Sequence, residues 1–200
     1  MKSTLSALAL CLATSWAVAQ PAGTPTVRLR GTVQAVTPTT LTVKARNGDT
    51  VALALPGTLA VQEVFPINLA DIQAGSFIGT AALPQPDGTQ RAIAVTVFPE
   101  SARGTGEGFH PFDLQPESTM TNATVADVAA APSGRKLQLK YKGGEQTLVI
   151  PPGTPIVTFR PGDRSLLVPG ASVSITAQEI AGQATATRVN AGRDGFALPY

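Results

Sequence analysis

One short stretch of the chain collects the side-chain types that bind metal ions. Glu107, His110, Asp113 and Glu117 follow one another at spacings of three, three and four residues. Together they offer one imidazole and three carboxylates, a set that can coordinate a divalent cation. The sequence contains a single histidine and no zinc-type spacing of Cys and His, which favours ordinary capping or solvation of a loop. Metal binding or delivery is therefore an alternative hypothesis.

The same stretch holds the residue types of a hydrolytic site. Ser101 or Ser118 is a candidate nucleophile with His110 as its base, and Asp113 is the candidate that orients the imidazole. Catalytic triads are rarely assembled from residues so close in sequence, and no Gly-x-Ser-x-Gly motif occurs. The glycines at 104, 106 and 108 lack the remainder of a dinucleotide or phosphate-loop motif. We therefore predict no catalytic residue and no cofactor, and a cryptic hydrolase is only the second alternative.

These residues belong to a Gly/Pro-rich connector, 100–121, which follows neither the helical nor the strand period. It nevertheless contains four sizeable apolar side chains, Phe109, Phe112, Leu114 and Met120. A solvated spacer would not need them, so we expect the connector to be ordered and to pack these side chains between two domains. On this expectation Phe112→Ala would lower the free energy of unfolding by roughly 3 kcal/mol.

The connector joins two similar segments, 27–99 and 122–191. Gly48 matches Gly144 and Val61 matches Val157, in both cases 96 residues further along the chain. Apolar residues alternate with polar or small ones in each segment, as in half-buried strands. Asn47-Gly48 and Gly143-Gly144 are typical of tight hairpin turns.

We therefore predict an all-β protein of two tandem small OB-like or Greek-key β-barrels, each with five to six strands. Short helical turns are expected near 67–72 and 164–167. An N-terminal tail, 20–26, precedes the first barrel. A C-terminal tail, 192–200, follows the second, and its Phe196 and Tyr200 are expected to fold back against a barrel.

In several short sequence motifs, the chain resembles a family of uncharacterised bacterial exported proteins with a tandemly repeated small β domain. The motifs are Gly-Thr-Val-x-x-Val at 31–36, Leu-Thr-Val-Lys at 41–44, Ala-Gly-Ser-Phe-Ile-Gly at 74–79, Arg-Gly-Thr-Gly-Glu-Gly at 103–108 and Ser-Thr-Met-Thr-Asn-Ala-Thr-Val at 118–125. The resemblance covers nearly the whole chain after its first twenty residues or so. It implies β structure and an envelope location, and it supplies no activity or site residue.

The N-terminus has the features of a cleavable secretory signal, 1–19. Lys2 precedes an apolar run, and Ala17-Val18-Ala19 provides small residues for cleavage near Ala19-Gln20. The run is too short to span a bilayer, so we expect no integral membrane segment. The predicted location is the periplasm or the exterior, with the only cysteine, Cys11, removed.

Charge gives little indication of a partner. The formal net charge is +2, and the basic residues of 135–142 alternate with apolar ones, as on one solvated strand face. We therefore predict no nucleic-acid binding. The leading hypothesis is an exported, non-enzymatic binding or scaffolding protein of the cell envelope. Its partner would be an envelope protein or a small ligand held between the domains. The sequence does not indicate an oligomeric state.

Overall fold

The computed structural model describes residues 25–132 and 134–200. The predicted signal peptide, 1–19, and most of the predicted N-terminal tail, 20–26, lie outside these residues. Within them, no helix combines the length and the apolar character needed to cross a membrane.

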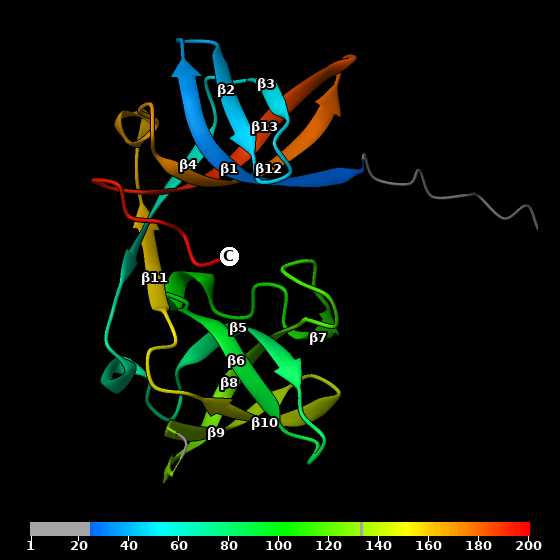
Figure 1. The fold of residues 1–200 in the computed structure, drawn as a ribbon, viewed down its shortest axis with the longest axis vertical. Helices are drawn as coiled ribbons and strands as arrows, with labels where there is room; N and C mark the ends of the chain where they lie inside the picture. Colours follow the sequence, from blue (N-terminus) through cyan, green and yellow to red (C-terminus); the bar gives the residue numbers. More distant parts are fainter. Residues whose placement is uncertain (1–24, 133) are drawn as a thin grey trace, which may run out of the picture.

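The fold is all-β, as predicted, and its strands belong to one continuous sheet (Figure 1). In chain order they are β1 (Thr26–Val36), β2 (Thr40–Ala45), β3 (Thr50–Ala54), β4 (Ala60–Pro66), β5 (Phe77–Pro84), β6 (Gln90–Val97), β7 (Gly108–Pro111), β8 (Thr119–Ala131), β9 (Gly134–Tyr141), β10 (Gly144–Ile150), β11 (Ile156–Pro161), β12 (Ser172–Ile180) and β13 (Gln183–Gly192). Short 3-10 turns occur at η1 (Leu69–Asp71), η2 (Glu100–Ala102) and η3 (Arg164–Leu166). η1 and η3 fall where the sequence predicts helical turns.

The sheet divides into two lobes joined by a pair of crossing strands (Figure 1). The upper lobe contains β1, β2, β3, β12 and β13, and the lower lobe contains β5 to β10. β4 and β11 run antiparallel to each other between the lobes, with Arg160 opposite Glu63. Each end of the sheet returns to its own lobe, because β3 also pairs with β13 and β10 also pairs with β6.

Each lobe combines strands from both predicted repeats. The upper core joins side chains between 33 and 61 to others between 166 and 191, and the lower core joins 72–95 to 123–156. The prediction that each repeat closes into its own barrel is therefore not confirmed. The reason is that β4 and β11 stay extended and carry the chain across to the other lobe. Alternation predicts which residues form strands, but it does not specify their partners.

Local predictions from the sequence agree with the structure. Val33, Leu41, Val43 and Leu53, which occupy alternate positions on their strands, are all buried. The hairpins β2–β3 and β9–β10 turn through Gly48 and Gly143, whose φ angles of 94° and 95° are accessible mainly to glycine. The connector is more regular than expected, because β7 pairs with β8 and β8 itself begins at Thr119.

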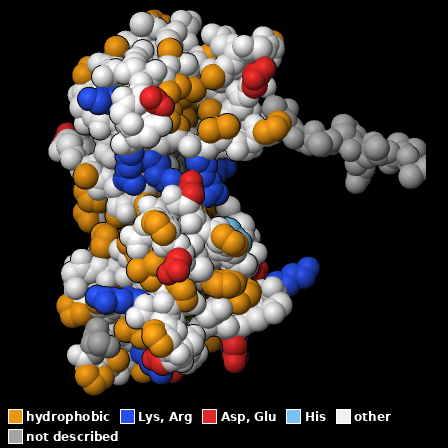
Figure 2. Space-filling view, turned by 45° about the vertical axis from the view of Figure 1, so that its right-hand side comes forward, with side chains coloured by type: hydrophobic (Ala, Val, Ile, Leu, Met, Phe, Trp, Pro, Cys, Tyr) orange, Lys and Arg blue, Asp and Glu red, His pale blue; other side chains and the backbone are white. Residues whose placement is uncertain are grey.

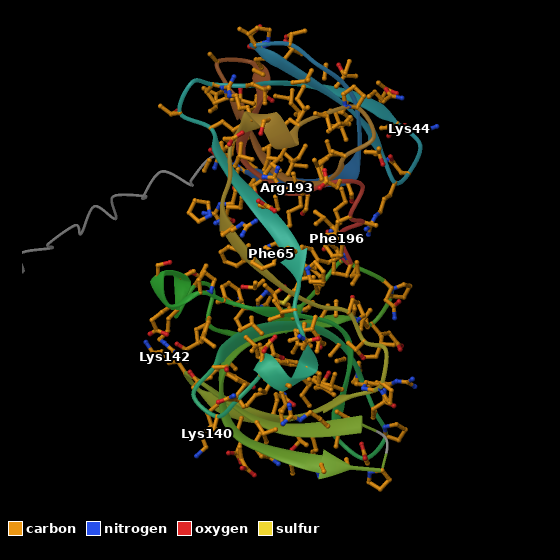
Figure 3. All side chains as sticks on the ribbon, turned by 90° about the vertical axis from the view of Figure 1, so that its left-hand side faces the viewer. Lys44, Phe65, Lys140, Lys142, Arg193 and Phe196 are labelled. Atoms are coloured by element: carbon orange, nitrogen blue, oxygen red, sulfur yellow. The ribbon has the colours of Figure 1, made fainter. Side chains whose placement is uncertain are left out.

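The C-terminal tail folds back onto the crossing strands. Leu198 is buried with Val64 and Val157 at the waist of the molecule, and Phe196 and Tyr200 pack against this group. Figure 3 shows Phe196 at the waist, close to the strands that link the two lobes. The expected contact therefore forms, although it is made with β4 and β11.

Candidate binding cleft between the lobes

The facing surfaces of the two lobes enclose a cleft of about 510 Å³. Its size lies within the range typical of small-molecule sites, roughly 300–1,000 Å³. We call the strand faces that line it the upper wall and the lower wall. The upper wall belongs to β1, β12 and β13, and the lower wall belongs to β8, β5 and β6.

The upper wall is polar and positively charged. Strand register places its side chains in two rows across three strands. They are Arg28, Thr176 and Arg188 in one row, and Arg30, Ser174 and Asn190 in the other. Side chains alternate along a strand. Leu29 and Val189, which lie between the two rows, therefore point to the core, whereas the side chains of the two rows point into the cleft.

The lower wall is built from smaller and less polar side chains. Its two rows are Asn122, Gly79 and Thr96, and then Met120, Ala81 and Ala94. A Cβ in place of the Gly79 hydrogen would lie 2.6 Å from Asn122 Oδ1 and 2.8 Å from the Phe98 ring, so both side chains would have to move to accept a larger residue. The central strand β5 therefore presents a flat, nearly bare floor to the upper wall.

The remaining lining comes from the crossing strands and the connector. β4 and β11 contribute Gln62 and Phe159, and the C-terminal tail contributes Tyr200. Burial raises the pKa of the Tyr200 hydroxyl above its ordinary value. The connector contributes residues of η2 and β7, including Ser101 and His110, together with Phe112.

The charge of the cleft is positive. Its lining includes Arg28, Arg30 and Arg188 and no acidic residue. Figure 2 shows Lys and Arg side chains gathered at the waist, below the upper lobe. Arg30 forms a two-point ion pair with Asp113, at 2.8 and 3.1 Å, and these hydrogen bonds lower the pKa of Asp113. Among the described residues, neither Arg28 nor Arg188 lies within ion-pair distance of a carboxylate.

Phe112 fastens the connector to the upper wall. The guanidinium carbons of Arg30 and Arg28 lie 5.2 and 5.6 Å from the centre of its ring, within the range of cation–π contacts. Phe112, which the sequence predicts to pack between the domains, thus contacts the upper lobe through these two arginines. Because the ring is half-buried, we now expect a smaller loss on its removal than the roughly 3 kcal/mol predicted from the sequence.

The other apolar connector residues differ in exposure. Leu114 and Met120 are half-buried, and Met120 belongs to the lower wall. Phe109 is 42% exposed, so the prediction that it packs between the domains is wrong. On β7, Phe109 and His110 are both exposed, because this four-residue strand covers only one edge of β8.

The four candidate metal ligands do not converge. Asp113 binds Arg30, and Glu107 accepts a hydrogen bond from the backbone N–H of Lys142 at 2.9 Å. His110 lies on β7, and Glu117 adopts a φ of 62° in the turn before β8. In residues 25–132 and 134–200, no group of three His, Cys, Asp or Glu side chains is arranged to hold a metal ion.

The candidate hydrolytic residues are also separated by their contacts. The Ser118 hydroxyl donates to the backbone oxygens of Phe112 and Gln115, and Asp113 is held by Arg30. Ser101 and His110 both line the cleft. The hydrogen bonds of the described residues include none that joins His110 to Ser101, Ser118 or Asp113.

Beside the cleft, a buried carboxylate holds the crossing strands together. Glu63 of β4 accepts two hydrogen bonds from Arg193 and two from Arg160, at 3.0 to 3.2 Å. Hydrogen bonds from Arg193, then from Arg160, lower the pKa of Glu63 to about 2. Figure 3 shows Arg193 and Phe65 at this waist. Arg160 also lies 4.8 Å above the ring of Phe65.

Sequence reasoning missed the residues that give the cleft its charge. Arg28 and Arg30 alternate with Val27, Leu29 and Gly31, so their shared face was readable from the sequence. Arg188 joins them only through the pairing of β12 with β13. The missing information was the long-range partner of β1.

No protein-family model, curated protein or solved structure gives a significant match to the chain. The resemblance to exported proteins with repeated β domains therefore remains a prediction.

Proposed function

We propose that this chain is an exported, non-enzymatic binding protein of the cell envelope, and that the cleft between its lobes is the ligand site. The observation that carries the proposal is the cleft of about 510 Å³, lined by complete strand rows from both lobes. Export is supported by the predicted signal peptide at 1–19. The separation of Ser118, His110 and Asp113 by other contacts supports the non-enzymatic part.

In this proposal each lobe is an OB-like barrel made from halves of two exchanged repeats. Matching pairings support it. β1 pairs with β12 as β8 pairs with β5, both antiparallel. β4 pairs with β13 as β11 pairs with β6, both parallel. The exchange of strands between the repeats holds the two walls in one arrangement. A preformed site favours binding, because less conformational entropy is lost when the ligand binds.

The test fills the cleft with a large side chain. Thr176 lies at the centre of the upper wall and is half-buried, so Thr176→Trp blocks the space between the walls. The matched control is Ile180→Trp, at the far end of the same strand, where the side chain is 49% exposed and outside the cleft lining. Both variants and the parent are screened by thermal shift and calorimetry against a library of anionic, neutral and cationic small molecules.

We expect ligands whose binding is lost in Thr176→Trp and retained in Ile180→Trp. The same proteins should show no turnover of esterase, phosphatase, peptidase or glycosidase substrates. Binding that survives in Thr176→Trp would place the site elsewhere. Turnover that disappears in His110→Ala would contradict the non-enzymatic proposal.

A further inference from the structure

Resting on the proposed function, we infer the chemical class of the ligand: an amphipathic organic anion. Its oxyanion group is held by Arg28 and Arg188 on the upper wall, and its flat apolar body lies on the Gly79–Ala81–Ala94 floor.

The arginine pair carries the first step. Arg28 and Arg188 flank Thr176 in one row, with no carboxylate at ion-pair distance in the described part of the chain. Neighbouring strands lie about 4.8 Å apart, so the two backbones are about 10 Å apart and both long side chains can reach a group above Thr176. An oxyanion there would accept charge-assisted hydrogen bonds from both guanidinium groups.

The ion pair of Arg30 makes this assignment specific. Arg30 has only 12% of its side chain exposed, and Asp113 already neutralises it. It therefore acts as a fixed part of the wall. Arg28 and Arg188, on the two outer strands of the same wall, form no ion pair within the described residues, so a carboxylate, phosphate or sulfonate can bind between them.

The lower wall determines the shape and polarity of the remainder of the ligand. Gly79, Ala81 and Ala94 form a floor without polar side chains. The ring of Phe98 lies beside Gly79 and contacts the ring of Phe159, which also lines the cleft. A ligand must satisfy both walls at once, since their rows face the same space. A small inorganic anion would leave this floor uncovered, and a neutral apolar molecule would gain no charge-assisted hydrogen bond from the arginines.

Two amide oxygens refine the class further. Asn122 Oδ1 and Asn190 Oδ1 are buried and accept no hydrogen bond within the described residues. The Asn122 amide is fixed, because its Nδ2 donates to the backbone oxygen of Thr105 at 3.0 Å. One oxygen lies on each wall, so hydroxyl or N–H donors on the body of the ligand would satisfy them.

Two fluorescent probes that share one aromatic body test the inference. Anilinonaphthalene sulfonate carries an oxyanion, and phenylnaphthylamine is its uncharged counterpart. Titrations are made with the parent protein, Arg28→Gln, Arg188→Gln and Thr176→Trp, with Arg91→Gln as an exposed arginine control outside the cleft lining. Circular dichroism confirms that each variant is folded.

We expect the sulfonate to bind more tightly than the neutral probe. Arg28→Gln and Arg188→Gln should each weaken the sulfonate by about tenfold and leave the neutral probe unchanged. Arg91→Gln should change neither, and Thr176→Trp should abolish both. Arg28→Lys keeps the charge and should therefore retain part of the affinity for the sulfonate. It replaces Arg28→Gln in the titrations if that variant proves unstable.

The outcomes separate the two proposals. Equal binding of both probes, lost only in Thr176→Trp, would overturn the anion inference and leave the cleft as the site. Binding of both probes that is unaffected by Thr176→Trp would overturn both proposals. Displacement of the sulfonate by naphthoate or by naphthyl phosphate identifies a carboxylate or a phosphate as the preferred group. Displacement by neither compound would overturn the inference.

Discussion

At the scale of single residues, the distribution of arginines separates structural roles from binding roles. Arg160 and Arg193 share the buried carboxylate of Glu63, and Arg30 is paired with Asp113. Each of these arginines joins segments that are far apart in the sequence. Arg28 and Arg188 have no such partner among the described residues, although they stand in the same cleft. Of the three arginines that line the cleft, Arg30 is thus held by a carboxylate, whereas Arg28 and Arg188 are the two that we propose for ligand binding.

The Glu63 cluster predicts a specific acid sensitivity. The pKa of Glu63 is about 2 in the folded protein, against an ordinary value of 4.5. A lowered pKa means that its contribution to stability is fully present above pH 4.5 and is lost as the pH falls towards 2. Glu63→Gln should therefore lower the Tm at neutral pH and make the Tm depend less steeply on pH across this window.

Thermal melts followed by circular dichroism at several pH values between neutrality and pH 2 measure this effect. Glu179→Gln is the control, because Glu179 is exposed at the end of β12 and forms no ion pair within the described residues. The same pH dependence in Glu63→Gln and the parent protein would show that the Glu63 cluster contributes little to stability.

At the scale of elements, the connector links the lobes through a few contacts. Its β7 strand extends the lower lobe through β8, and Phe112 and Asp113 reach the upper wall through Arg28 and Arg30. The connector therefore closes one side of the cleft, while β4 and β11 close the other.

Phe112→Ala tests the strength of that link. The ring is half-buried and contacts two guanidinium groups, so we expect a loss of about 1–2 kcal/mol in the free energy of unfolding. Phe109→Ala is the matched control, since Phe109 is exposed on the same connector, and it should change stability by less than about 0.5 kcal/mol. Urea denaturation of both variants gives the values. Equal losses for the two variants would remove the special role of Phe112.

The sequence predicts elements well and their long-range partners poorly. Strand alternation locates Leu41 and Val43 in a core, and Gly48 and Gly143 in hairpin turns, because these features depend on neighbouring residues. The pairing of β1 with β12 depends on residues about 150 positions apart, and nothing local distinguishes it from pairing within one repeat. For the same reason, the connector residues were predictable candidates, whereas the row that joins Arg28 to Arg188 was not.

At the scale of the whole molecule, the two lobes share the strands of both halves of the chain. The upper core needs segments on both sides of the connector, and so does the lower core. Neither half of the sequence can bury its apolar face alone. The protein should therefore unfold as one cooperative unit.

A cut in the connector tests this interdependence. A recognition sequence for a specific protease is inserted between the exposed residues Gly104 and Gly106. It allows a single cleavage between the two halves of the chain. We expect the cleaved protein to elute from a size-exclusion column as one particle of unchanged size, and its fragments to separate only in denaturant. Two fragments that elute separately and stay folded would show that the halves are independent domains.

The pairing of β1 with β12 also sets an order in time. Thr26 and Gln178, which are hydrogen-bonded partners, lie 152 positions apart in the chain. Contacts across such separations form slowly, because closing a loop of that length costs conformational entropy before the contact can form. All strands of the lower lobe are present once the chain has been synthesised as far as Ile150. The upper lobe is complete only after β12 and β13 have been synthesised. β1 is thus the first strand to be made and among the last to gain its second neighbour.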